Sequence, residues 1–468
     1  MIRKQDILDR AAEWGMRPDV VEKDYVLGWL LAAIAENAET QSAWIFKGGT
    51  CIKKCYFETY RFSEDLDFTL LPEASYTEAA IRETIINVAT RAAELSGVEF
   101  PGERVEVRSM RNRQGEPTFQ GRIAYRGPLG VPTFPRVLFD LTQYEPVIDE
   151  PALRSVFHPY PDGLPEGAGV ATYSFNELLA EKTRALYQRA RPRDLYDVVF
   201  LLENHPEAFD LAHVRDVFRQ KCAAKQISEL SSRDLLGMVS NAPELESEWE
   251  NMLGHQLPRL PRLDDLKSRL AALLVWIDEP LAAVAASVRE VPLGRQEAPL
   301  APAGIQYWGT GVPLEAIRFA GANRLLVEFA YHGKHRRVEP YSLRRASTGN
   351  VLLYAWEQAS GHVKAFNVAE IAGVKTTDTP FTPRYQIEFT TQGPVSAPAI
   401  AVSPRIRSQR RRVSSSRRHG TTYVFECTYC RKRFRHAKND SALRKHKAKD
   451  SKWDCPGRRG YLVDTTWN

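Results

Sequence analysis

The sequence has 468 residues, 43% of them hydrophobic and 26% charged, which is the composition of a soluble globular protein with more than one domain. Its first residues, MIRKQDILDRAAEWG, lack the apolar core of a signal peptide. The longest apolar run, LAALLVWI at 270–277, is too short to cross a bilayer. We therefore expect a cytoplasmic protein with no membrane partner.

The net charge of +6 is unevenly distributed along the chain. Residues 404–468 hold 19 Lys and Arg against 5 Asp and Glu, a net charge of +14, so the other 403 residues together carry −8. Basic tails usually bind nucleic acid, so we expect RNA or another nucleic acid as the partner of this tail. The alternative is a tail that only increases solubility.

The first 290 residues alternate between helical and strand-like patterns, which predicts an α+β fold. We expect a mixed sheet with helices in 1–150 and a helical domain in 151–290 that completes the active site. In chain order, the pattern predicts helices within 4–37, a strand at 43–46, a turn and helix at 48–59, a strand at 64–71, a helix at 77–95, strands at 98–111, 118–126 and 135–145, and helices through most of 176–290.

The remaining chain divides into four segments. Pro and Gly dominate 291–312, which predicts a linker. In 313–395, short strand-like runs separated by Gly-containing turns predict a small β-barrel. Residues 396–420 are low in complexity and rich in Arg, which predicts a basic disordered linker, and 421–468 form a separate small module.

The stretch FKGGTCIKKCYFETYRFSEDLDF at 46–68 carries the chemistry. Gly48 and Gly49 form a turn where backbone amides approach a phosphate closely, because no side chain intervenes. Asp65 and Asp67 are two apart on a predicted strand, so both carboxylates leave the same face. Such carboxylates repel each other unless a cation lies between them, and magnesium prefers carboxylate and phosphate oxygens. The alternative is an ordinary turn followed by a strand with solvated acids.

The same stretch resembles the KGGT…RxSxDLDF signature of the AbiEii/AbiGii-type nucleotidyltransferase toxin family. Three further segments match in the same order: VVEKDYVLGWLL at 20–31, RVLFDLT at 136–142 and LLAEKTRALYQRARPRDLYDVVFLL at 178–202. The resemblance covers about residues 1–280 and implies a nucleotidyltransferase-type sheet that uses an NTP and magnesium. One departure is Thr50, where many nucleotidyltransferases have serine, but the hydroxyl group is kept.

The resemblance implies a role for each matching residue. Asp65 and Asp67 would bind magnesium, Asp140 would be a third carboxylate that activates the acceptor hydroxyl, and Lys182 and Asp194 would complete the catalytic set. The nucleotide would be held by Lys47, Gly48, Gly49, Thr50, Arg61, Ser63 and Arg191.

Three of these residues have a structural alternative. Asp140 would then be an ordinary strand residue, Lys182 part of a solvated helix face, and Asp194 a helix N-cap. Asp197, one helical turn after Asp194, would be a salt-bridge partner.

The predicted barrel resembles a WYL domain in RRVEPYSL at 336–343, LLYAW at 352–356 and KAFNVAEI at 364–371. The resemblance implies a small Sm-like barrel that senses a ligand or nucleic acid. The chain departs from the family at Lys364, where Arg is common, and at Ala369-Glu370, where Asp-Arg is common. The alternative is a barrel used only for packing or dimerisation.

The C-terminal module contains a C-x-x-C pair followed by a histidine and a further cysteine. Thiolate and imidazole ligands at this spacing suit tetrahedral zinc, which would supply most of the stability of so small a module. The predicted ligands are Cys427, Cys430, His446 and Cys455, with His436 as the alternative fourth ligand. The other cysteines, Cys51, Cys55 and Cys222, are scattered and predicted to be buried.

The spacing within this module also resembles a zinc finger. Phe434 and Leu443 stand where a ββα finger places its two core residues. Lys and Arg residues around the ligands would form a phosphate-binding surface. The alternative is a disordered tail with unligated cysteines.

Together these features predict a nucleotidyltransferase that transfers NMP from an NTP to RNA, such as the 3′ end of tRNA. The resemblance implies a toxin of a toxin–antitoxin or abortive phage-defence system, restrained by a cognate antitoxin or by its own appended domains. One alternative is a catalytically inactive, nucleotide-binding regulator that binds nucleic acid through the barrel and the zinc module. Another is an enzyme that transfers NMP to protein side chains.

Overall fold

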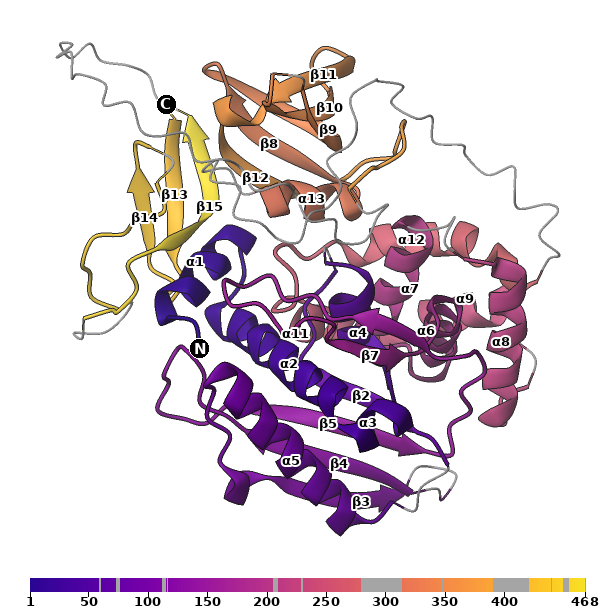
Figure 1. Ribbon diagram of the computed structural model, residues 1–468. Helices are drawn as coiled ribbons and strands as arrows, with labels where there is room; N and C mark the ends of the chain where they lie inside the picture. The colour runs from indigo at the N-terminus through magenta and orange to yellow at the C-terminus, as the bar shows by residue number, and fades with distance from the viewer. Residues whose placement is uncertain are drawn as a thin grey trace.

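A computed structural model of the chain describes residues 1–278, 314–389 and 421–467, with short gaps at 59, 73–75, 112–114, 116, 205–208, 229, 347, 439 and 449–453. The two predicted linkers, 291–312 and 396–420, lie outside the described residues. Figure 1 shows three parts: a large body of helices and strands, a β-rich part packed on it, and a small C-terminal sheet beside the N-terminal helix.

The body is built on seven strands: β1 (Trp44–Lys47), β2 (Asp65–Leu70), β3 (Glu106–Arg111), β4 (Pro117–Ala124), β5 (Arg136–Gln143), β6 (Ala152–Ser155) and β7 (Gly169–Thr172). They form one sheet in the order β3-β4-β5-β2-β1-β7-β6. β2 is parallel to β5 and β1 to β7, whereas the other neighbours are antiparallel. The predicted mixed sheet is therefore present.

Helices of the N-terminal segment pack against this sheet: α1 (Lys4–Trp14), α2 (Pro18–Glu36), α3 (Ala38–Ala43) and α5 (Glu78–Ser96). α2 and α5 run side by side across one face of the sheet (Figure 1). α2 begins at Pro18, whose fixed φ suits a first helical turn, and it is buried on nearly all sides. α5 is capped by the Thr77 hydroxyl, which accepts a hydrogen bond from the amide of Ala80 at 3.1 Å.

The second half of the body is helical, as predicted, but the sheet extends into it. Its helices are α6 (Phe175–Arg189), α7 (Pro192–Asn204), α8 (Leu211–Ala224), α9 (Ser232–Ser240), α10 (Pro243–Ser247), α11 (Trp249–Leu253) and α12 (Leu263–Leu273). β6 and β7 lie beyond residue 150, where we expected the helical domain to begin. β6 is short and largely exposed, so it lacks the apolar alternation that predicts a strand. None of the helices in the described ranges combines the length and apolarity needed to span a membrane.

The β-rich part consists of α13 (Leu314–Ala322), β8 (Leu325–Tyr331), β9 (Lys334–Arg345), β10 (Val351–Glu357), β11 (His362–Asn367) and β12 (Ile371–Pro380). Its strands form a sheet in the order β11-β10-β9-β8-β12. Residues 384–389 lie outside the named strands, and Ile387 and Phe389 are buried in the core. Buried side chains of this part and of the body belong to one hydrophobic cluster among the described residues, so the two share a core.

The C-terminal module is a three-stranded antiparallel sheet of β13 (Thr421–Cys427), β14 (Arg433–His436) and β15 (Gly460–Trp467), in the order β14-β13-β15. The expectation of a ββα finger is wrong in its third element, since the described residues between β14 and β15 contain no helix. A third strand replaces it by pairing along the whole of β13. Phe434 and Leu443 nevertheless pack in the module core as predicted.

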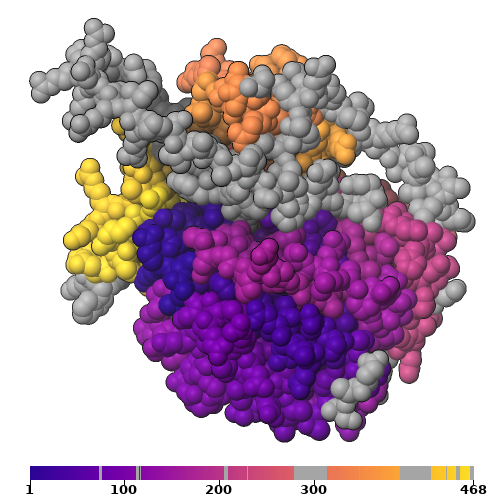
Figure 2. All heavy atoms as spheres, in the orientation of Figure 1, coloured from indigo at the N-terminus to yellow at the C-terminus, as the bar shows by residue number. Residues whose placement is uncertain are grey.

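The C-terminal module contacts the first helix of the body. Arg459 pairs with Asp9 at 2.9 Å, and the Lys4 ammonium donates to the Tyr429 hydroxyl at 3.4 Å. Figure 2 shows the yellow C-terminal atoms against the indigo atoms of α1. The first helix of the chain therefore packs beside its C-terminal module.

Candidate functional site

Three carboxylates meet on one face of the central sheet. Asp65 and Asp67 lie on β2 with side chains on the same face, and the register of the parallel pair places Asp67 beside Asp140 of β5. Burial, followed by the charges of Asp140 and Asp65, raises the pKa of the Asp67 carboxyl to about 6. Burial also raises the pKa of Asp65. Such a cluster is stabilised by a cation, and its oxygen ligands suit magnesium.

The glycine turn directly abuts these carboxylates. β1 ends at Lys47, and a short helix, α4 (Gly48–Cys51), begins the turn and continues as a π-helix over Ile52–Tyr56. Gly48 has φ +81°, and a Cβ built there would lie 2.1 Å from a carboxylate oxygen of Asp67. Only glycine fits this backbone at that distance. The predicted turn and the predicted carboxylates therefore form one site.

The rest of the turn is held from β2 and from the segment before it. The Thr50 hydroxyl donates to the backbone carbonyl of Asp65. A Cβ at Gly49 would lie 2.5 Å from the Arg61 guanidinium and 3.1 Å from the Ser63 hydroxyl, so both side chains reach the turn.

A buried ion network fixes the cations beside the turn. Arg61 donates two hydrogen bonds to Asp197 of α7, at 2.7 and 2.8 Å, and the Lys182 ammonium of α6 lies 2.7 Å from the same carboxylate. Burial alone would raise the pKa of Asp197, but Arg61 and Lys182 hold it well below its usual range. The interpretation of Asp197 as a salt-bridge partner is confirmed. Lys182 also stabilises the charged form of Asp67.

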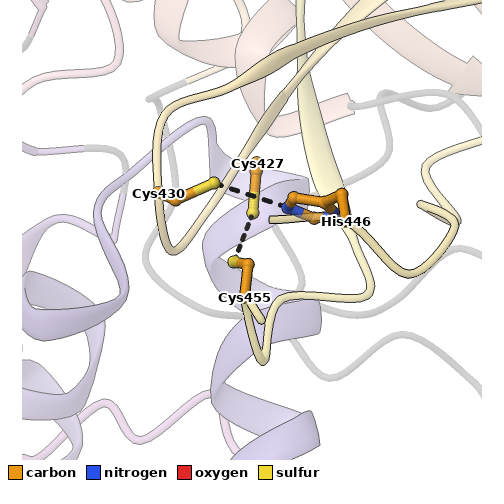
Figure 3. A group of neighbouring side chains, drawn as sticks. All are labelled: Cys427, Cys430, His446 and Cys455. Carbon is orange, nitrogen blue, oxygen red and sulfur yellow. Dashed lines mark hydrogen bonds between the residues drawn. The ribbon is translucent and has the colours of Figure 1, made fainter. Parts of the chain in front are cut away.

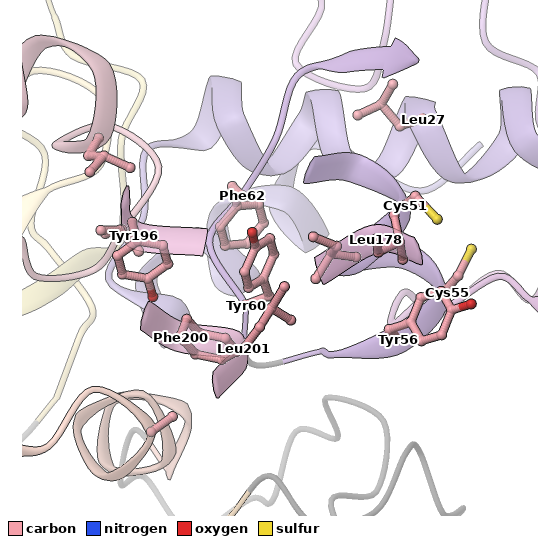
Figure 4. Close-up of a cluster of buried hydrophobic side chains, with 14 of the residues drawn as sticks. Leu27, Cys51, Cys55, Tyr56, Tyr60, Phe62, Leu178, Tyr196, Phe200 and Leu201 are labelled. Atoms are coloured by element: carbon pink, nitrogen blue, oxygen red, sulfur yellow. The ribbon is translucent and has the colours of Figure 1, made fainter. Parts of the chain in front are cut away.

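Aromatic side chains pack beside this ion network. Tyr60 precedes Arg61, and its ring lies 5.2 Å from that of Phe200, which in turn stacks on Tyr196 at 5.8 Å. Figure 4 shows these rings together with Phe62 and the Cys51 and Cys55 side chains, which are buried as predicted. The position of Arg61 therefore depends on the hydrophobic core.

The remaining predicted residues form ion pairs with other side chains or are exposed. Lys47 forms an ion pair with Glu145. Asp194 is buried in the first turn of α7 and accepts two hydrogen bonds from Arg189, at 2.6 and 2.8 Å. Arg191 is exposed just before that helix.

Two residues near the site were not among the predicted site residues. Arg193 of α7 stabilises the charged form of Asp65. The Gln120 amide of β4 donates to Asp140 at 3.3 Å. Arg193 carried a signal, because it lies between Arg191 and Asp194 in a matched segment, whereas Gln120 is placed only by strand register.

A match to the sequence model of a protein family identifies the family of this chain. The sequence model of the family "Nucleotidyl transferase AbiEii toxin, Type IV TA system" matches residues 29–274, slightly more than half of the chain. The chain belongs to the AbiEii family. The AbiEii match contains the glycine turn, all three carboxylates and the Arg61–Asp197–Lys182 network. The predicted family and the predicted nucleotidyltransferase activity are confirmed, and the family description implies an NTP substrate and a cognate antitoxin.

Two solved structures illustrate how this AbiEii protein compares with known ones. MenT4, a nucleotidyltransferase toxin from Mycobacterium tuberculosis H37Rv, is 21% identical with a TM-score of 0.42, over 61% of this chain and 92% of that chain. Proteasome accessory factor B/C of Arthrobacter aurescens is 15% identical with a TM-score of 0.15, over 40% of this chain and 25% of that chain. No curated protein matches the chain.

A second cluster of ligand-type side chains lies outside the AbiEii match. The structure brings together Cys427, Cys430, His446 and Cys455, whose ligand atoms all lie within 4.8 Å of one another (Figure 3). Within the cluster, the sulfurs of Cys427 and Cys455 lie 3.7 Å apart, and the sulfur of Cys430 lies 3.4 Å from the Nε2 of His446.

The chemistry of this cluster suits a cation that binds thiolates. None of the three cysteines forms a disulfide, and burial with the neighbouring thiols raises the pKa of Cys455 to about 12. Three thiols and an imidazole at these distances match a tetrahedral zinc site. The alternative ligand His436 is not in the cluster and packs its ring 5.2 Å from that of Phe425.

Proposed function

We propose that this AbiEii-family protein is a magnesium-dependent toxin that transfers NMP from an NTP to an RNA hydroxyl, such as the 3′ end of tRNA, in the cytoplasm. The observation that supports it most is the contact between the Gly48 turn and Asp67, with Asp65 and Asp140 alongside. Phosphoryl transfer uses backbone amides that phosphates can approach closely and carboxylates that hold a metal ion. This site offers both.

The residues divide the chemistry between them. Asp65 and Asp67 would hold magnesium, which supplies charge neutralisation on the phosphates. Asp140 accepts the proton of the acceptor hydroxyl, whose oxygen then bonds to the α-phosphorus. The bond from the α-phosphorus to the bridging oxygen breaks, and pyrophosphate leaves. Asp197 holds Arg61 and Lys182 beside the turn, where their charges face the triphosphate.

A labelling assay tests this proposal. The purified chain is incubated with magnesium, total tRNA and each α-³²P-labelled NTP in turn, beside an Asp65→Ala/Asp67→Ala control. Label on RNA that depends on both aspartates is the expected result. Label on protein instead of RNA would replace the RNA acceptor with a protein side chain, and no label on either would contradict the proposal.

We also propose that Cys427, Cys430, His446 and Cys455 hold a structural zinc ion. The proposal rests on the convergence of four predicted ligands from separate segments of the module. Metal analysis of the purified chain should find one zinc per chain.

In this scheme the C-terminal module recruits nucleic acid, the WYL-like β-rich part senses a trigger, and the toxin acts in defence against phage.

A further inference from the structure

The outer strands of the main sheet have one covered face and one open face. On β3, β4 and β5, the side chains of Val107, Phe119 and Phe139 are buried toward α5. Gly121 is on the same side, where a Cβ would lie 2.7 Å from Ile85 of α5. The helices seen across the sheet in Figure 1 therefore cover this face closely.

The opposite face of these three strands is open and polar. Every second residue of β5 is partly or fully exposed, at Arg136, Leu138, Asp140 and Thr142. The same alternation holds for Gln120 and Arg122 on β4, and Arg108 and Met110 of the edge strand β3 are exposed. Because Asp140 belongs to this face, the open surface is continuous with the candidate active site.

Strand register orders this face into rows that begin at the carboxylates. One row runs from Asp67 through Asp140 and Gln120 to Arg108. The next row runs from Asp65 through Leu138 and Arg122 to Glu106. With strands about 4.8 Å apart, Arg122 lies roughly 10 Å from Asp65, and Arg108 roughly 14 Å from Asp67.

A hydrogen-bonded chain links one of these cations to the site. Arg122 donates to the Gln120 side-chain oxygen at 3.2 Å, and the Gln120 amide donates to Asp140 at 3.3 Å. The guanidinium is thus held in a defined position relative to a catalytic carboxylate. The Arg108 side chain is 73% exposed, and its guanidinium lies 4.0 Å from a carboxylate oxygen of Glu106.

We propose that this open face of β3, β4 and β5 is the platform on which the acceptor RNA strand lies, with Arg108, Arg122 and Arg136 contacting its phosphates. The proposal rests on the proposed function and specifies how the acceptor reaches the site. Three arginines against Glu106 and Asp140 leave this face with a net positive charge, which favours a polyanion, and the rows lead the strand to the carboxylates. The exposed Met110 offers an apolar contact for a base.

The test compares a triple variant, Arg108→Gln/Arg122→Gln/Arg136→Gln, with a triple Arg→Lys variant in the full chain. The matched control is Arg219→Gln, an exposed arginine on α8, on the far side of the body from β3 (Figure 1). Total tRNA is the RNA probe. Three quantities are measured: KM for tRNA in the labelling assay, affinity for NTP, and binding of labelled tRNA across a range of salt.

We expect the Gln variant to raise KM for tRNA at least tenfold, with NTP affinity and kcat at saturating tRNA nearly unchanged. The slope of log affinity against log salt concentration should become shallower by about 2, because each phosphate contact on a single strand contributes about 0.7 to that slope. The Lys variant should keep most of the affinity, because the charges remain.

The outcomes separate this inference from the proposed function. Unchanged tRNA binding and KM in the Gln variant would overturn the platform, whether or not label is transferred. If no variant labels RNA but the Gln variant alone loses tRNA binding, the platform stands and the transfer reaction is wrong. If the Gln variant changes only the oligomeric state, the face binds a second copy and the inference fails.

Discussion

The two clusters of ligand-type residues in this chain are built in opposite ways. The carboxylates Asp65, Asp67 and Asp140 sit on strands of a seven-stranded sheet within a core of dozens of buried side chains. The Cys427, Cys430, His446 and Cys455 cluster sits in a module whose own core contains few hydrophobic residues. The fold of the body holds the carboxylates in place. In the C-terminal module, by contrast, metal binding to the cluster would hold the fold together.

This difference predicts different consequences of losing a ligand. In the body, the packed core holds three acids together despite their mutual repulsion. Removing one carboxylate should therefore lower activity without unfolding the protein. In the module, too little apolar area is buried to offset the entropy of ordering the chain, so a lost thiolate costs the structure itself.

The largest effect should follow Cys455→Ser. Structural zinc contributes roughly 10 kcal/mol or more to the folding of small zinc modules. We expect zinc to fall from one per chain to none and residues 421–467 to become sensitive to protease, while the body melts at its original temperature. Cys222→Ser, which alters a buried cysteine of the body, is the control and should keep the zinc. A protease-resistant module without zinc would contradict the comparison.

Breaking the ion network of the body comes next. Asp197→Ala leaves Arg61 and Lys182 buried without their shared carboxylate, which should cost about 3–5 kcal/mol of unfolding free energy. The matched control is Asp19→Ala, which breaks an exposed ion pair with Arg17 and should cost at most about 1 kcal/mol. Denaturant unfolding measures both. Equal costs would mean that the network contributes no more than a surface pair.

A carboxylate of the proposed magnesium site should behave differently from Asp197. We expect Asp67→Asn to lower nucleotidyl transfer by roughly 10²–10³-fold, the usual cost of removing one preorganised electrostatic group. The melting temperature should stay equal or rise, because the repulsion among Asp67, Asp140 and Asp65 is reduced. Parallel assays of activity and melting test this. A large loss of stability would place Asp67 with the structural residues.

The smallest effect concerns Glu58, which lies near Arg318 and Glu315 of the β-rich part. Burial raises its pKa to about 7, so the folded chain holds a proton there between pH 4.5 and 7 that the unfolded chain has lost. Stability from this group therefore falls as pH rises through that window. Glu58→Gln should raise the unfolding free energy by about 2–3 kcal/mol at pH 8 and hardly at all at pH 4. An equal effect at both pH values would rule out this carboxyl as the cause.

Local spacing in the sequence was enough to predict which neighbouring residues share each cluster. Asp65 and Asp67 share a face because side chains alternate along a strand, and Gly48 is recognisable because only glycine suits such a turn. The C-x-x-C pair likewise brings two sulfurs together within one tight turn. Each of these inferences concerns residues a few positions apart, where covalent geometry restricts the arrangement.

Contacts between distant segments were decided only by tertiary structure. Asp140 joins Asp67 through pairing of β2 with β5, Asp197 captures Arg61 through packing of α7, and β15 replaces the expected helix of the C-terminal module. Arg108 and Arg122 look like ordinary strand residues until register aligns them with the carboxylates. Such pairings depend on which apolar faces bury each other across the whole core, and no local pattern encodes that choice.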